Sequence, residues 1–344
     1  MMQSKTKHIV AVVIPCWNEE NLLPEMLDSL LNQTFQGWCA FCVDDQSTDA
    51  TAEVIKSYQA KDNRIQYVCR NRTPKGGQTC RNIGLELAKN SKYVTFFDAD
   101  DLIAPYCLEQ RVKYMEDHED LDCAVFPILG YRDNLDEVGS PAFGFKTFED
   151  DLPAMLNFCI PMAVSTNIYR IKNLFNHDIY WDENVQSMQD SDFSFQIMLH
   201  GLKYEYALDA RADYFYRMHN TGVASTISNS TQITSHLYLM QKVTDAITKK
   251  YGVQYDLFLG LYIAKFLPIM RHKTRYVSIR SIPWVANHIG FKMRLLLYSI
   301  CGQHFWSKFF RKYRAISLQM DEKWRSQTIK VRANLLERGA VLPK

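Results

Sequence analysis

The strongest constraint on the fold of this chain is a series of unbroken apolar runs, rich in β-branched and aromatic residues. They cover residues 9–14 and 38–43, and residues 94–97 are four further β-prone residues that predict a buried strand. A run without polar alternation is typical of a strand that is buried on both faces, as in a parallel sheet. Between the first two runs, apolar residues from Leu22 to Leu31 recur with helical spacing. Strands that alternate with helices over short connections predict an α/β fold with a Rossmann-like, mostly parallel sheet flanked by helices.

Each of these strands leads into a polar and mostly acidic loop. The loops contain Asn18-Glu19-Glu20, Asp44-Asp45 and Asp98-Ala99-Asp100-Asp101. The carboxyl ends of parallel strands meet at one edge of a sheet, so we expect these loops to converge on a site. Carboxylates this close repel one another unless a cation lies among them, and hard oxygen ligands suit Mg²⁺ or Mn²⁺. The alternative is that each loop only caps the helix that follows it; Ser47 or Thr48 would cap the helix predicted over residues 50–60.

The chain lacks both common glycine-rich phosphate cradles. There is no Gly-x-Gly-x-x-Gly after the first strand and no Gly-x-x-x-x-Gly-Lys-Ser/Thr. A bound diphosphate would therefore need another counter-charge, which a metal ion would supply. A second acidic cluster, Asp190 and Asp192, lies at the start of another predicted helix. N-capping explains one of these two carboxylates but does not explain both.

Seven short motifs resemble, in order, those of the GT-A-fold family 2 glycosyltransferases, the large inverting group that builds bacterial surface polysaccharides. The motifs are Val13-Ile14-Pro15-Cys16-Trp17-Asn18-Glu19-Glu20, Leu30-Leu31-Asn32-Gln33-Thr34-Phe35, Val43-Asp44-Asp45-Gln46-Ser47-Thr48-Asp49, Arg81-Asn82-Ile83-Gly84, Asp98-Ala99-Asp100-Asp101, Gln189-Asp190-Ser191-Asp192-Phe193 and Tyr216-Arg217-Met218-His219. The resemblance covers residues 8–220. It implies a GT-A-like sheet and a nucleotide-sugar-binding catalytic domain over residues 1–220.

The resemblance also implies which residues hold the donor and the metal. The implied nucleotide and donor contacts are Pro15, Asn18, Glu19, Asp45, Arg81, Asp98 and Asp101, with Asp101 facing the donor sugar. The implied ligands of Mn²⁺ or Mg²⁺ are Asp98, Asp100 and His219. Either Arg81 or Arg217 would place positive charge near the leaving diphosphate. For both arginines a surface ion pair is the alternative.

The family's general base maps to Asp190. The residue before it is Gln189, where the family has Glu, so a negative charge next to the base is missing. Spacing alone leaves Asp192 open as the base, and only the resemblance favours Asp190.

The implied reaction is the inverting transfer of a sugar from a nucleoside diphosphate, expected to be UDP, to an acceptor hydroxyl in glycan synthesis. One alternative is a nucleotidyltransferase on a similar sheet. That reading lacks the Gly- and Lys/Arg-rich loop that would meet a triphosphate after the first strand. The other alternative is a nucleotide-sugar-binding protein that has lost catalysis, against which the retention of Asp98, Asp100 and Asp190 argues.

The end of the chain differs from the rest in charge. Residues 265–344 carry 17 Lys and Arg against 3 Asp and Glu, whereas the whole chain has a net charge of +2. We expect a flexible loop over residues 221–234 and a helical region over residues 235–344. Aromatic and basic residues from Trp284 to Tyr313 are typical of a helix that lies on an anionic membrane. The alternative is a helical region that packs on the catalytic core or on a second subunit of a homo-oligomer.

Several observations bear on the cellular location and the partners. The nine cysteines are scattered and include no Cys-x-x-Cys pair, which favours buried thiols in a reducing compartment. Residues 284–302 are interrupted by charged residues, so they do not read as a membrane span. No apolar signal region is seen at the start of the sequence. We therefore expect a cytoplasmic protein, peripheral on the inner face of the membrane, with a lipid-linked or glycan acceptor and no nucleic acid partner.

Overall fold

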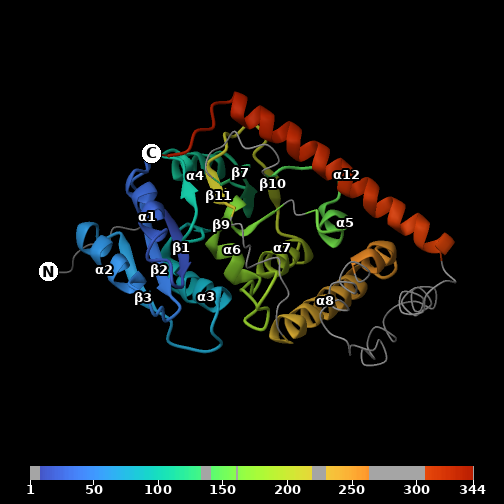
Figure 1. The fold of residues 1–344 in the computed structure, drawn as a ribbon, viewed down its shortest axis with the longest axis horizontal. Helices are drawn as coiled ribbons and strands as arrows, with labels where there is room; N and C mark the ends of the chain where they lie inside the picture. Colours follow the sequence, from blue (N-terminus) through green and yellow to red (C-terminus); the bar gives the residue numbers. More distant parts are fainter. Residues whose placement is uncertain (1–7, 133–140, 160–161, 219–229, 263–306, 344) are drawn as a thin grey trace.

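The computed structural model describes residues 8–132, 141–159, 162–218, 230–262 and 307–343. A seven-stranded sheet in the order β10-β6-β9-β4-β1-β2-β3 forms its centre (Figure 1). Its strands are β1 (Val10–Cys16), β2 (Trp38–Asp44), β3 (Ile65–Cys69), β4 (Tyr93–Phe96), β6 (Cys123–Val125), β9 (Asn167–Arg170) and β10 (Tyr204–Tyr206). Only β9 runs antiparallel to its neighbours. The predicted α/β fold with a mostly parallel sheet is confirmed.

Helices flank this sheet and connect its strands. They are α1 (Leu23–Leu31), α2 (Thr51–Lys61), α3 (Gly77–Leu87), α4 (Cys107–Asp117), α5 (Asp151–Leu156), α6 (Ile171–Asn176) and α7 (Gln189–Leu199). The predicted cap of α2 is wrong, because the backbone N–H of Thr51 is bound by the carboxylate of Asp49, at 3.0 Å, and not by Ser47 or Thr48. Asp49 lies closer to the helix by one or two positions and offers a charged acceptor in place of a hydroxyl.

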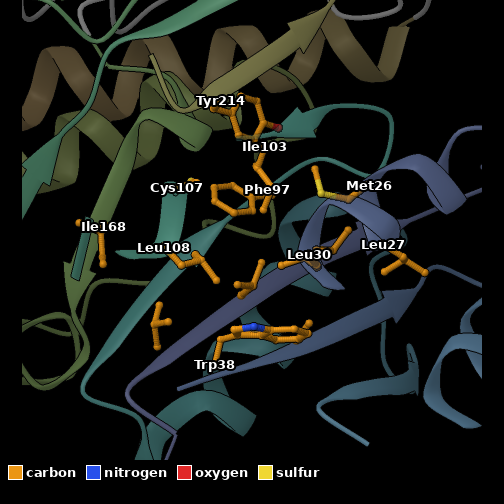
Figure 2. Packing of buried hydrophobic residues seen from close by; sticks show 14 of the residues in the cluster. Met26, Leu27, Leu30, Trp38, Phe97, Ile103, Cys107, Leu108, Ile168 and Tyr214 are labelled. Atoms are coloured by element: carbon orange, nitrogen blue, oxygen red, sulfur yellow. The ribbon is translucent and has the colours of Figure 1, made fainter. Parts of the chain in front are cut away.

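The first strand shows why an unbroken apolar run was needed. Val10, Val12 and Ile14 belong to the hydrophobic cluster on one face of the sheet, whereas Ala11 and Val13 belong to the cluster on the other face. Alternate side chains of a strand point to opposite faces, so both faces of β1 are covered. Figure 2 shows the first cluster, which includes Met26, Leu27 and Leu30 of α1 and the ring of Trp38 from β2.

A second, four-stranded sheet was not predicted. Its order is β5-β11-β7-β8, with β5 (Leu102–Ile103), β7 (Ile128–Tyr131), β8 (Ala142–Phe143) and β11 (Tyr214–Arg217). Strands of two to four residues are too short to give a period in the sequence. This sheet matters for the site because β11 contacts the loop that follows β4.

Two long helices of the C-terminal region pack on this core. Helix α8 (Ser230–Tyr251) contacts α7, and α12 (Ser307–Glu337), the long red helix of Figure 1, contacts β8. Leu335 of α12 packs against Leu129 and Phe215 of the second sheet, and Arg332 donates to the carbonyl of Gly130 at 2.9 Å.

These contacts test part of what was expected for residues 221–344. Over residues 307–337 the helix packs on the core, which was one of the two alternatives. The predicted loop over residues 221–234 is wrong at its end, because α8 begins at Ser230. Residues 219–229 and 263–306, with most of the aromatic and basic stretch, lie outside the described residues. Among the described helices, none combines the length and the apolar character that crossing a membrane requires.

Candidate active site

The three acidic loops emerge from parallel neighbours. β1 pairs in parallel with both β2 and β4, and Cys16 is level with Asp44. The loops after β1, β2 and β4 therefore lie at the same edge of the sheet, as predicted.

The first two loops are bound to each other. The side chain of Asn18 accepts from the backbone N–H of Thr48 at 2.8 Å, and the carboxylate of Glu20 accepts from that of Ala50 at 2.8 Å. In the reverse direction, the N–H of Glu19 donates to the hydroxyl of Thr51 at 2.8 Å. Asn18 adopts a positive φ of 55°, a conformation that Asn tolerates better than most residues. Pro15 lies within β1, level with Val43, directly before this loop.

Asp45 has a partner that sequence reasoning missed. Its carboxylate forms a buried ion pair with Arg70, and the two side chains are 6% and 7% exposed. Arg70 follows β3, the strand next to β2, so it lies at the same edge of the sheet. A basic residue directly after a predicted parallel strand was the available signal. The pair fixes the position of Asp45 in the second loop because neither charge can be left alone at this depth.

Asp98 and Arg81 are in contact at the end of β4. The guanidinium of Arg81, from α3, lies 2.6 Å from the carboxylate of Asp98, and a third of the Asp98 side chain stays exposed (33%). Burial raises the pKa of Asp98 to about 6, Arg81 opposes this rise, and the negative charges of Asp100 and Asp190 add to it. That influence indicates that Asp190 is near Asp98 in space, although 92 positions separate them in the sequence.

Arg81 also reaches the helix that carries Asp190. Its other terminal nitrogen donates to the side-chain oxygen of Gln189 at 2.8 Å. Arg81 therefore connects the loop after β4 to the first turn of α7. Gln189 is neutral, so it binds the guanidinium without adding to the negative charge that Asp98 already places there. Asp190 accepts from the backbone N–H of Val164 at 3.2 Å, which orients its carboxylate.

Asp192, the alternative base, is occupied elsewhere. Its side chain is 2% exposed and forms an ion pair with Lys242 of α8 at 2.6 Å. Lys242 also pairs with Asp182 at 2.8 Å, and Gln196 donates to Asp192 at 2.8 Å. Burial raises the pKa of Asp192, against the effect of Lys242. Asp192 therefore joins α7 to α8, which accounts for the second carboxylate that N-capping did not explain.

Asp101 binds β11. One carboxylate oxygen accepts from the hydroxyl of Tyr214 and the other from the backbone N–H of Arg217, at 2.6 Å. The residue is 1% exposed. The hydroxyl of Tyr214 in turn accepts from the N–H of Asp98 at 3.1 Å. Both carboxylate oxygens are thus used inside the protein, and this geometry favours a role in holding the loop over contact with the donor sugar.

Arg217 holds the same loop from outside. Its Nε donates to the carbonyl of Asp100 at 2.8 Å, and a terminal nitrogen pairs with Glu25 of α1 at 2.7 Å. The ion pair considered in the sequence is therefore present for Arg217. For Arg81 the ion pair is also present, but its partner is Asp98 of the predicted site.

A divalent metal is implied by the resemblance, and the described residues allow a test of the fit. Among them, no group of three or more His, Cys, Asp or Glu side chains is placed to hold a metal ion. His219 lies outside the described residues. Asp98 and Asp100 nevertheless offer two carboxylates at one loop, and Mg²⁺ is commonly held by one or two carboxylates together with waters and substrate phosphates. The donor set fits that kind of site.

A family model matches the N-terminal part of the chain. The model of Glycosyl transferase family 2 covers residues 11–177. An uncharacterized glycosyltransferase of Methanocaldococcus jannaschii is 26% identical over 295 residues, which cover 82% of this chain and 100% of that relative. The poly(ribitol-phosphate) beta-N-acetylglucosaminyltransferase TarS of Staphylococcus aureus is 28% identical over 62% of this chain, a match that spans only 36% of TarS.

A solved structure agrees in fold. The crystal structure of a fragment of S. aureus TarS in complex with UDP-GlcNAc superposes with a TM-score of 0.63 at 19% identity, over 95% of this chain and 91% of the fragment. At 19% identity this superposition supports a shared fold and no assignment of substrate or residue roles. Residues 11–177 therefore match glycosyl transferase family 2, and the chain has the GT-A fold.

Proposed function

We propose that this protein transfers a sugar from UDP to an acceptor hydroxyl with inversion at the anomeric carbon. One observation carries the proposal. Arg81 binds Asp98, at the predicted donor site, with one nitrogen and Gln189, next to the predicted base, with the other. The acidic loop and the start of α7 are thus joined across one guanidinium. The printed names of relatives, which include glucosyl- and N-acetylglucosaminyltransferases, support the same reaction class.

Each residue has a role in this proposal. The nucleobase of the donor contacts Pro15, at the end of β1, and Asn18 and Glu19 in the loop that follows. Asp45 in the second loop contacts it as well. Asp98 and Asp100 hold Mn²⁺ or Mg²⁺, and when bound that cation supplies positive charge to the diphosphate. Arg81 adds charge on the same side.

Asp190 is the proposed general base. Inversion needs a base and a leaving group on opposite sides of the anomeric carbon. Asp190 lies in the first turn of α7, the end of the helix at which an acceptor hydroxyl would have to meet it. The N–H of Val164 occupies one of its oxygens, which leaves the other for the acceptor proton. Asp192, buried against Lys242, is the weaker candidate.

Substitution of Asp190 by Asn tests this assignment. Asn keeps the size and the acceptor for Val164 but cannot take a proton, so turnover should fall by about 10²–10⁴-fold, the usual contribution of a general base. UDP-sugar affinity, measured by calorimetry, should stay unchanged. Equal turnover in the variant would reject Asp190 as the base. Release of UDP from the wild type, rather than pyrophosphate, separates sugar transfer from nucleotidyl transfer, and no turnover with intact UDP binding would favour a non-catalytic binding protein.

We also propose a surface-polymer acceptor reached at the inner face of the membrane. The names of relatives that act on poly(ribitol-phosphate) support a polymer acceptor. The excess of basic residues after residue 264 supports contact with anionic lipid. Co-sedimentation with vesicles of anionic lipid, and none with zwitterionic vesicles, is the expected result. Absence of binding to both would remove this part of the proposal. Light scattering of the purified chain would establish whether it forms a homo-oligomer.

A further inference from the structure

A cavity lined by tyrosines lies at the C-terminal end of α7, the opposite end from the turn that carries Asp190. Its volume is about 190 Å³, and its walls include Asp150, at the start of α5, Tyr204 of β10, Tyr251 at the end of α8, and Tyr255. The end of α7 forms another wall through Met198. Asp190 and Met198 are eight positions apart on one helix, which corresponds to about 12 Å along its axis.

The phenol groups of Tyr204 and Tyr255 are held in place by hydrogen bonds. Tyr255 donates to the carboxylate of Asp150 at 2.7 Å, and Tyr204 donates to that of Asp151 at 2.9 Å. Since each hydroxyl proton is committed to a carboxylate, the phenolic oxygens retain lone pairs that accept hydrogen bonds. Tyr251 and Tyr255 meet edge to face, with ring centroids 5.0 Å apart, so both rings are fixed in their relative tilt.

One carboxylate completes the chemistry. Asp150 is exposed, and one of its oxygens caps α5 while the other binds Tyr255. The two carboxylate oxygens keep further lone pairs that can accept from a hydroxyl group in the cavity.

We propose that this cavity binds one neutral sugar unit of the acceptor glycan. A sugar ring offers hydroxyl donors to the carboxylate of Asp150 and to the phenolic oxygens, and an apolar face to the rings of Tyr251 and Tyr255. The inference rests on the proposed function, because it places this subsite about 12 Å from the base along α7. An acceptor of several sugar units would then contact the protein at both places. A short acceptor would reach Asp190 alone.

Three variants test the subsite. Asp150→Asn removes the charge but keeps a good N-cap for α5. Tyr251→Ala removes a ring that carries no structural hydrogen bond in the described contacts, and Tyr251→Phe, the matched control, keeps the ring. The probe is an array of neutral oligosaccharides of two to eight units, with calorimetry on the strongest binder.

The expected result is that the wild type and Tyr251→Phe bind a long oligosaccharide, whereas Asp150→Asn and Tyr251→Ala bind it about tenfold more weakly, the effect of losing one charged hydrogen bond or one stacked ring. UDP affinity should be the same in all four proteins. Two results would overturn the subsite: the wild type binds UDP but no oligosaccharide, or it binds an oligosaccharide that none of the variants binds more weakly. If the wild type does not bind UDP at all, the proposed function is contradicted instead.

Discussion

Tyr214→Phe should loosen the acidic loop that carries Asp98 and Asp100. The hydroxyl of Tyr214 lies inside this loop, donates to the buried carboxylate of Asp101 and accepts from the N–H of Asp98 at 3.1 Å. The substitution deletes one oxygen atom and leaves the ring, which packs against Phe97 with centroids 5.0 Å apart. Packing is therefore preserved, and only the two hydrogen bonds are lost.

The expected loss of stability follows from the two groups that lose a hydrogen bond, the carboxylate of Asp101 and the N–H of Asp98. A hydrogen bond to a charged group contributes about 1.5–3 kcal/mol, and a buried N–H without an acceptor costs about 1–3 kcal/mol. Because the hydroxyl helps to keep the pKa of Asp101 from rising still further with burial, part of the loss is relieved when Asp101 takes up a proton. We expect the free energy of unfolding to fall by about 2–4 kcal/mol.

Urea denaturation measures this stability, and calorimetry with UDP measures binding in the presence and absence of Mn²⁺. The metal-dependent part of the affinity should fall about tenfold or more, since 1.4 kcal/mol corresponds to a factor of ten, while metal-independent binding stays the same. Tyr131→Phe is the matched control: this tyrosine is 2% exposed on neighbouring β7, and its hydroxyl makes no hydrogen bond to a described residue. If both variants behave alike, the proposed role of Tyr214 is refuted.

Three other substitutions have sharp expectations. Lys242→Met leaves Asp192 buried without a counter-charge and should lower the free energy of unfolding by about 3–5 kcal/mol in urea denaturation. A second change, Asp192→Asn, should restore most of this loss, and no recovery would contradict the ion pair. Gly84→Ala places a Cβ 2.3 Å from Val13 Cγ1, so it should cost about 1–3 kcal/mol in the same assay, and adding Val13→Ala should relieve that cost. Arg70→Ala removes the buried counter-charge of the second loop, so the affinity for UDP by calorimetry should fall about tenfold or more; unchanged affinity would separate this pair from nucleotide binding.

The part of the fold that was predictable is the part in which local pattern and burial agree. The strands β1, β2 and β4 are mostly apolar because both of their faces are covered, so their composition alone reveals them. The second sheet has no such signature. β5 and β8 contain two residues each, and their pairing depends on β11 and β7, which arrive from distant parts of the chain.

The site divides in the same way. Asp98 and Asp100 are visible in the sequence because carboxylates cluster after one strand. Lys242 gives no such signal, since it meets Asp192 only in three dimensions. Arg70 does have one, its place directly after a parallel strand, but the sequence does not show that its partner is Asp45. The sequence also could not show that Asp192 is enclosed while Asp190 is not, because both carboxylates lie in one helical turn and their surroundings depend on where α8 packs.

The bonds between the first two loops have a consequence for the thermodynamics of nucleotide binding. Asn18 and Glu20 hold Thr48 and Ala50 through hydrogen bonds that need no ligand. A site whose loops are already ordered loses little conformational entropy when it is filled. The nucleobase should therefore bind to loops that do not rearrange. We expect fast association, and a heat-capacity change on binding that corresponds to the surface covered by the nucleotide alone, with no added contribution from ordering of the loops.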